Sequence, residues 1–406
     1  MVSMHEHYRV HGNMDEYVKV MDELGIEKAI FLPTGHSPNN ARYREYSQEL
    51  AKVAKQYPGK IYWFATTWSK DPEAVNVLDD QIRQGARGIK LLDWLKGFEG
   101  AELDGPQMYA IYALAKKHQL PMLLHVDLQK HPEWIPKLEK AVSEFPTVTF
   151  VLAHYCRAAS EPVPDLAICG RILEKHPNVH ADISMGGGVK RYMRYFDHDP
   201  ETFREFILTH QDKLMWGTDM ILDGQEEKTA TWMKRRIMQD ITMMATPIYL
   251  SPFYKTDTAV HQGLALPREV LEKLFYKNAV RVLAVVFSSE KVSVLPKPRQ
   301  GSPDRFLERR LRHPEFAVRG GAIEPLGQSR LVNDAPRQER FGAGERGREL
   351  GRRRCRHRQR IRDFPSRWGD ARLPSHPPRQ VTESQILARQ QISSTLHASL
   401  SRQHMA

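Results

Sequence analysis

The stretch Thr149-Phe150-Val151-Leu152-Ala153-His154 is a continuous run of apolar residues that ends in a histidine. Apolar residues that do not alternate with polar ones are typical of a strand in a parallel sheet whose outer face is covered. In barrels of such strands, functional side chains lie at the carboxyl ends of the strands. The stretch therefore predicts a buried parallel strand and a candidate site residue, His154.

Seven similar β-rich runs occur between residues 1 and 287, and segments with helical periodicity lie between them. The expected strands are Val2 to His7, Ala29 to Leu32, Ile61 to Thr66, Gly88 to Leu92, Met122 to Val126, Thr149 to His154, Val179 to Ile183, and Leu214 to Thr218. The expected helices are Met14 to Leu24, Tyr43 to Tyr57, Pro72 to Gln84, Gln107 to His118, Pro136 to Phe145, Leu166 to His176, and Pro200 to His210. Eight such units predict an α/β fold of the TIM (β/α)8 barrel type. The alternative is an open doubly wound sheet, which would place a glycine-rich phosphate turn after an early strand, and none is present.

Local signals predict where several helices begin and end. Asp71-Pro72 and Asp199-Pro200 each place an acidic cap before a proline, which favours a helix start. Gly25 and Gly85 follow expected helix ends.

Composition divides the 406 residues near residue 287. Residues 1–287 hold 21 Lys and 14 Arg against 37 acidic residues, whereas residues 288–406 hold 2 Lys and 23 Arg against 12. The net charge of +11 therefore belongs to the second part, and it does not indicate that the first part binds nucleic acid or a membrane.

Residues 288–406 show no sustained apolar periodicity, and we expect a disordered, Arg-rich tail after a barrel domain over residues 1–287. The run from Gly351 to Arg360 would bind a polyanion such as RNA. We favour the alternative that the tail is a read-through or frame artefact, because lysine gives way to arginine so abruptly.

The three cysteines, Cys156, Cys169 and Cys355, are too few and too scattered for a disulfide framework. They predict unpaired thiols and a reducing compartment. The sequence begins without a leader peptide, and no apolar run reaches the roughly 18 residues needed to span a membrane. We therefore expect a cytoplasmic protein.

Several strands end in residues that can bind a metal. His5 and His7 face the same way on a strand, with Glu6 on the opposite side. Zinc prefers imidazole and carboxylate ligands, and a catalytic site leaves one position open for water. The residues predicted to hold a metal are His5, His7, His125 and Asp219. Asp219 would also accept the proton of the water, and His154 would orient the water or stabilise an oxyanion.

Each of these residues also has a structural interpretation. A single histidine at a strand end is more often a hydrogen-bonded core residue than a ligand, and only the joint placement favours a site. Lys90 is predicted to bind a substrate carboxylate, although it could instead pair with Asp93 or, if carboxylated, bridge two metals. Arg157 is predicted to bind an anionic substrate. The run of glycines 186–188 fits a phosphate cradle or, more commonly, a flexible turn.

The sequence resembles the amidohydrolase superfamily, specifically the amidohydrolase-related group of metal-dependent hydrolases and decarboxylases. The resemblance extends over roughly residues 1 to 286. The matching residues are His5-Glu6-His7, Leu124-His125, Leu152-Ala153-His154 and Gly217-Thr218-Asp219, followed by Leu266 to Leu271 and Lys277 to Arg281, which are similar to the terminal helix of the family.

The resemblance implies one divalent metal, with zinc expected and manganese as the alternative, held by the residues that match His5, His7, His125 and Asp219. It implies hydrolysis of an amide, ester or lactone in a small carboxylated molecule, or alternatively non-oxidative decarboxylation. We also expect a homo-oligomer. Ser3 stands where the family has an aspartate, and with so little chain before it we expect the first strand to pair weakly.

Overall fold

The computed structural model describes residues 1–33, 42–94, 100–157, 164–284 and 287. All of them belong to one compact unit, Met1–Glu324. The predicted tail over residues 288–406 lies outside the described residues, so its disorder stays a prediction. Within the described ranges, no helix is both long enough and apolar enough to cross a lipid bilayer.

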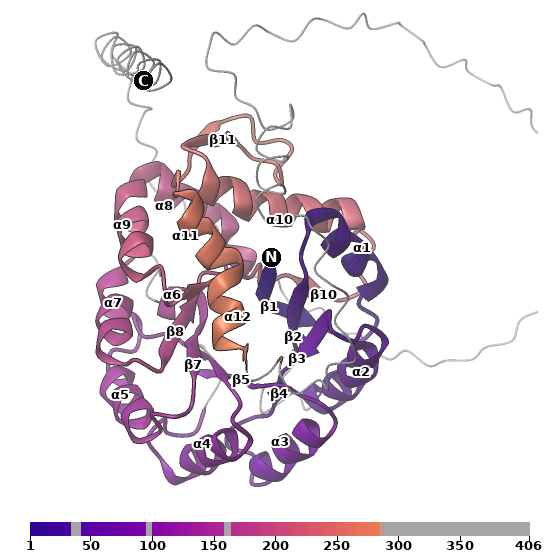
Figure 1. The fold of residues 1–406 in the computed structure, drawn as a ribbon, viewed down its shortest axis with the longest axis vertical. Helices are drawn as coiled ribbons and strands as arrows, with labels where there is room; N and C mark the ends of the chain where they lie inside the picture. The colour runs from indigo at the N-terminus through magenta and orange to yellow at the C-terminus, as the bar shows by residue number, and fades with distance from the viewer. Residues whose placement is uncertain (34–41, 95–99, 158–163, 285–286, 288–406) are drawn as a thin grey trace, which may run out of the picture. The chain divides into compact units, whose positions relative to one another are not determined.

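Parallel strands form the centre of this unit, and helices surround them (Figure 1). The strands are β1 (Val2–Tyr8), β2 (Lys28–Pro33), β3 (Ile61–Trp63), β4 (Ala65–Thr66), β5 (Ile89–Trp94), β6 (Met122–Val126), β7 (Phe150–Leu152), β8 (Val179–Asp182), β9 (Leu214–Met215), β10 (Ile221–Leu222), β11 (Ile248–Leu250) and β12 (Val260–Gln262). One sheet has the order β10-β1-β2-β3, and another has the order β4-β5-β6-β7-β8-β9.

Backbone hydrogen bonds join these two sheets at both ends. Phe64, between β3 and β4, donates to the carbonyl of Phe31 at 3.1 Å. Just past β9, the carbonyl of Trp216 accepts from the amide of Met4 in β1 at 2.9 Å. The parallel strands therefore close on themselves, which confirms the predicted barrel.

The seven helices predicted from periodicity are all present, with end shifts of a few residues, and the structure adds others that were not predicted, among them Val189–His198 and Ala230–Ala245. The helices are α1 (Met14–Leu24), α2 (Tyr43–Gln56), α3 (Ala74–Arg83), α4 (Pro106–His118), α5 (Trp134–Glu144), α6 (Ala153–Cys156), α7 (Leu166–Lys175), η1 (Gly186–Gly188), α8 (Val189–His198), α9 (Pro200–His210), α10 (Ala230–Ala245), α11 (Arg268–Glu272), η2 (Lys273–Lys277) and α12 (Asn278–Val282). Asp199 caps α9 by accepting from the amide of Thr202 at 3.2 Å. The prediction that Asp71 caps a helix is wrong, because Asp71 accepts from the amide of Glu73 and α3 begins only at Ala74.

Apolar side chains fill the interior of the barrel. They are Val2, Met4, Ile30, Leu32, Tyr62, Phe64, Leu123, Val151, Ala153 and Met215, together with Ala279 and Leu283 from the last helix. Through these two residues, helix α12 packs against the apolar interior of the barrel (Figure 1). The polar residues lie toward the carboxyl ends of the strands, where barrels of this type place their chemistry.

Strand β1 is firmly built into the barrel, so the expectation of weak pairing is wrong. It pairs with β2 from its first residue, Val2 opposite Lys28, and with β10 through His7 opposite Ile221. All seven of its residues are buried. The residues before the two histidines are therefore sufficient to pair this strand.

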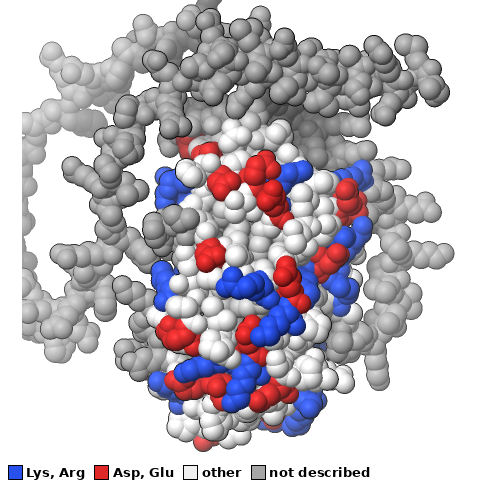
Figure 2. Space-filling model, turned by 90° about the vertical axis from the view of Figure 1, so that its left-hand side faces the viewer, with Lys and Arg blue, Asp and Glu red and all other residues white. Residues whose placement is uncertain are grey.

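The segment 220–266, in which the sequence predicted neither a helix nor a strand, contains β10, the helix α10 and the β11–β12 hairpin. On the face shown in Figure 2, acidic and basic side chains are intermixed. That mixture agrees with the nearly balanced composition of residues 1–287.

Candidate metal centre

His5 and His7 share a face of β1 by alternation, and that face points into the barrel because β1 changes phase along its length. Met4 belongs to the apolar interior, and strict alternation would turn His5 outward. The pairing of β1 with β2 shifts between Ser3 and Glu6, and this irregularity brings the two histidines to the inside. Their Nε2 atoms lie 3.2 Å apart.

Asp219 completes a group of three with these histidines. Its Oδ1 lies 2.9 Å from Nε2 of His7 and 3.4 Å from Nε2 of His5. The amide of Asp219 donates to the carbonyl of His5 at 2.7 Å, which ties β1 to the segment between β9 and β10 at this point. Gly217 permits this approach, since a Cβ there would lie 2.6 Å from the amide nitrogen of His5.

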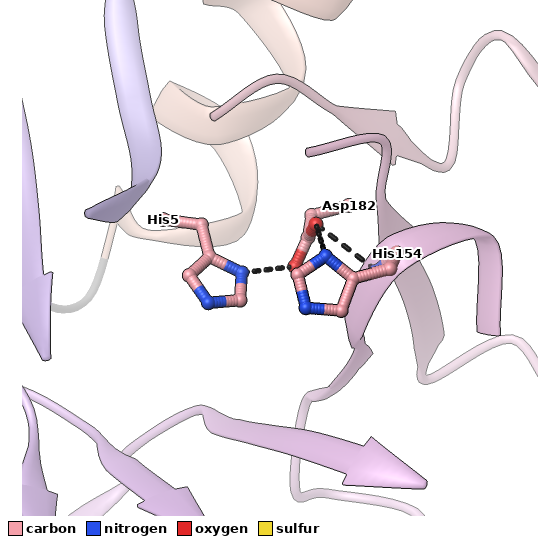
Figure 3. A group of neighbouring side chains, drawn as sticks. All are labelled: His5, His154 and Asp182. Atoms are coloured by element: carbon pink, nitrogen blue, oxygen red, sulfur yellow. Dashed lines mark hydrogen bonds and ion pairs between the residues drawn. The ribbon is translucent and has the colours of Figure 1, made fainter. Parts of the chain in front are cut away.

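A buried carboxylate, Asp182, orients the ring of His5 and holds the backbone of His154 (Figure 3). Its Oδ2 accepts from Nδ1 of His5 at 2.8 Å, and its Oδ1 accepts from the amide of His154 at 3.1 Å. Because Nδ1 of His5 carries the proton, its Nε2 presents a lone pair to Asp219 and His7. That arrangement is the usual one for a histidine that binds a metal through Nε2.

His154 occupies an unusual backbone turn next to this group. It and the following three residues, through Arg157, all have positive φ angles between 53° and 56°. Such a conformation costs roughly 1–2 kcal/mol per residue, so the surrounding structure must hold it. The carbonyl of Ser184 accepts from Nδ1 of His154 at 3.0 Å, which leaves Nε2 unprotonated, 3.7 Å from Oδ2 of Asp219. Burial lowers the pKa of His154 to about 4, so its ring is neutral at neutral pH.

His125 lies beside His154, with the two ring centroids 4.6 Å apart. It is 8 % exposed, and neither ring nitrogen has a hydrogen-bond partner among the described residues. It is not within the close group formed by His5, His7 and Asp219, whose ligand atoms all lie within 4.8 Å of one another. A buried imidazole without partners is costly unless a ligand satisfies it.

The donor atoms of the site fit a divalent cation. Burial lowers the pKa of His5, His7 and His125, so their rings are neutral and can bind a metal. Burial alone would raise the pKa of Asp219, but the neighbouring histidines outweigh it and lower that pKa, so the carboxylate is ionised. Three neutral imidazoles and a carboxylate form a donor set that suits zinc.

Lys90 lies next to the His5, His7 and Asp219 group. It is fully buried, and its Nζ is 3.3 Å from Nε2 of His5. Burial lowers its pKa to about 8, while Asp182 and Asp219 act in the opposite direction. The other partner considered for Lys90, Asp93, accepts from the amide of Ser69 at 2.6 Å.

Arg157 lies at the edge of the site with its side chain 23 % exposed. Its Nη2 is 3.4 Å from Oδ2 of Asp127, which follows β6. Burial is the main cause that lowers the pKa of both His125 and His154, and the nearby positive charge of Arg157 acts in the same direction.

The prediction of unpaired cysteines is wrong for two of the three. Cys156, in the left-handed turn, forms a disulfide with Cys169 of α7. The turn curls the chain back onto this helix, and spacing along the sequence could not show that approach. The argument from cysteine usage for a reducing compartment therefore fails.

Sequence reasoning missed Asp182, Ser184 and the role of Gly186. Asp182 ends β8 as a polar residue after apolar ones, the same signal that indicated His125, but the strand was expected to run on to Ile183. The glycine run 186–188 forms the 3₁₀ turn η1. A Cβ on Gly186 would lie 2.1 Å from Oδ2 of Asp219, so only glycine fits beside this carboxylate.

Residues 5–285 match the family described as Amidohydrolase. The chain therefore belongs to the amidohydrolase family, which confirms the resemblance in its sequence. A comparison with curated proteins found no match.

Among solved structures, the chain is similar to an uncharacterised TIM-barrel protein of Bordetella bronchiseptica, with 16% identity, a TM-score of 0.43, and 66% of this chain and 82% of that chain covered. It is also similar to an amidohydrolase of Burkholderia multivorans with bound zinc, with 14% identity, a TM-score of 0.47, and 70% and 98% covered. A third is 5-carboxyvanillate decarboxylase of Sphingomonas paucimobilis, with 12% identity, a TM-score of 0.42, and 70% and 98% covered.

Proposed function

We propose that this chain is a metal-dependent hydrolase that cleaves an amide, ester or lactone bond in a small carboxylated molecule. The observation that carries the proposal is the meeting of His5, His7 and Asp219 at the mouth of the barrel, beside two further buried histidines. His125, whose ring nitrogens have no hydrogen-bond partner among the described residues, is the fourth proposed ligand. A divalent cation held there, zinc by its donor set, supplies a Lewis acid and lowers the pKa of a bound water toward about 7.

The residues around the metal ligands have distinct proposed tasks. Oδ2 of Asp219 faces His154 and is placed to take the proton of the attacking water. His154 is neutral, with its Nδ1 proton directed to Ser184, so its Nε2 is a proton acceptor that can orient the water. This tautomer favours orienting the water over donating to an oxyanion, the other role considered from the sequence.

Two cationic residues are proposed to recognise the substrate. Arg157, at the edge, offers a planar guanidinium that suits a carboxylate. Lys90 is buried beneath His5, so it can reach only a group that enters the site fully.

The test begins with elemental analysis of the purified protein and of the His125→Ala and Asp219→Ala variants. We expect about one equivalent of zinc in wild type, and a large loss of metal in both variants. His118→Ala is the matched control, because His118 pairs with Asp79 on the outside of the barrel. A wild-type protein that contains no metal and cannot be reconstituted with zinc or manganese would contradict the proposal.

The reaction is tested with panels of esters, lactones and amides, alongside carboxylated aromatic acids. Product formation from the first panel supports hydrolysis. Release of CO2 from the acids, with silence from the esters, lactones and amides, would show instead that the site is a decarboxylase.

A further inference from the structure

Arg236, in the middle of α10, is a buried arginine that reaches toward the candidate site from outside the barrel. It is 3 % exposed, and it forms an ion pair with Asp240, which is 1 % exposed. Its Nη2 donates to the carbonyl of Thr218 at 2.8 Å and lies 3.4 Å from the carbonyl of Gly186. A buried charge is retained only where such contacts satisfy it.

The two carbonyls belong to two different segments that both adjoin Asp219. Thr218 directly precedes it, and Gly186 lies so close that an added Cβ would meet its Oδ2. The amide of Gly186 also donates to the carbonyl of Thr218 at 3.1 Å. Arg236 therefore ties together the peptide that leads into Asp219 and the turn that lies against its carboxylate.

Asp219 depends on such support because its backbone is left-handed, with φ at 55°. Aspartate visits this conformation more readily than most other residues, but it still costs free energy, and contacts with neighbouring groups offset that cost. Rotation of the Thr218 peptide would swing the carboxylate away from Nε2 of His5 and His7.

We propose that Arg236 is a positioning residue that aims the Asp219 carboxylate at His5 and His7 by fixing the carbonyls of Thr218 and Gly186. The inference rests on the proposed metal centre, and Arg236 itself touches neither metal nor substrate. Asp240 supports the arrangement because it neutralises Arg236 and accepts from Nε1 of Trp216 at 3.3 Å.

The informative variant is Arg236→Lys, which keeps the positive charge beside Asp240. A lysine ammonium lacks the planar fork that reaches two carbonyls and a carboxylate together. Arg204→Lys is the matched control, because Nη1 of Arg204 also donates to two carbonyls, those of Leu264 and Ala265, each at 3.0 Å. A second variant, Arg236→Met with Asp240→Asn, removes both charges and keeps an acceptor for Trp216.

The experiment measures Zn2+ affinity of the full chain by chelator competition, the visible spectrum of the Co2+-loaded protein, and thermal unfolding of the metal-free protein. We expect both Arg236 variants to unfold cooperatively, to bind Zn2+ at least about 10-fold more weakly than wild type, and to show an altered Co2+ spectrum. Arg204→Lys should match wild type in affinity and spectrum.

Two results would overturn the inference, and they differ in what they say about the proposed function. Wild-type affinity and an unchanged Co2+ spectrum in both Arg236 variants would show that Arg236 braces the fold without positioning Asp219. Absence of Zn2+ binding in wild type would remove the metal centre and the positioning role together.

Discussion

Replacing Asp93 by asparagine should make the free energy of unfolding fall less steeply as the pH rises. Asp93 lies near the end of β5 and is fully buried. Its Oδ2 accepts from the amide of Ser69, while its Oδ1 has no partner in the described part of the chain. Burial raises its pKa from 3.8 to about 6, although the bond from Ser69 acts in the opposite direction.

The sign and size of the effect follow from this shift. Between pH 3.8 and about 6 the folded state holds a proton on Asp93 that the unfolded state has lost, so the free energy of unfolding falls as pH rises. A shift of about two units corresponds to about 3 kcal/mol once both states are ionised. Between pH 5 and pH 8, wild type should lose about 1 kcal/mol of unfolding free energy relative to Asp93→Asn. That difference amounts to a few degrees in melting temperature for a domain of this size.

The assay is urea and thermal unfolding of wild type and Asp93→Asn from pH 5 to pH 8, with chelator present so that metal binding does not contribute. The new amide adds a buried donor, which lowers stability equally at every pH and leaves the slope unaffected. Asp22→Asn is the control, because Asp22 is 63% exposed beside Lys60. Curves of unfolding free energy against pH that run parallel for wild type and Asp93→Asn would refute the reasoning.

Three further outcomes can be checked directly. Gly186→Ala should weaken Zn2+ binding by about 10- to 100-fold, because the added Cβ collides with Asp219. Gly188→Ala is the control and should bind Zn2+ as wild type does, because among the described residues its Cβ would come no closer than 3.8 Å to the ring of Tyr192. Equal Zn2+ affinities of the two variants would contradict this prediction. Replacing both Cys156 and Cys169 by serine should lower the free energy of unfolding by about 3 kcal/mol in urea titrations, since the disulfide closes a loop with a sequence separation of 13. Deleting residues 288–406 should leave cooperative unfolding and metal content intact and abolish any salt-sensitive RNA binding; loss of folding on deletion would show that the tail is part of the domain.

The barrel could be predicted from the sequence because its signal is local and repeated. Continuous apolar runs separated by amphipathic segments leave few other folds, and the predicted β6 (Met122–Val126) and α1 (Met14–Leu24) agree to the residue. No helix was predicted in the segment 220–266, because its helix α10 is buried on more than one side and has charged residues such as Arg236 among its buried residues. Its pattern is therefore not that of a simple amphipathic helix.

The candidate ligands could be named from strand ends alone, but the contacts that orient them could not. Asp182 is 177 residues from His5 in sequence, and Arg236 contacts the backbone carbonyls of Thr218 and Gly186. Neither contact has a spacing that a sequence reveals. The disulfide was missed for the same kind of reason, because it depends on four successive left-handed residues.

The pair His5 and His7 shows how much the alternation of side chains along a strand leaves open. Alternation along a strand makes the two histidines share a face, but it does not say which face. If β1 kept the phase set by Met4, both rings would point toward the helices and no site would form. The shift between Ser3 and Glu6 reverses the phase, and it leaves both of these residues on the outer side, where Ser3 donates to Glu6. Glu6 in turn accepts from the amides of Thr218 and Met220, which flank Asp219. Glu6, the residue between the histidines, thus holds the irregular strand against the segment that carries Asp219, the third proposed ligand, so the motif needs its central carboxylate as well as its two rings.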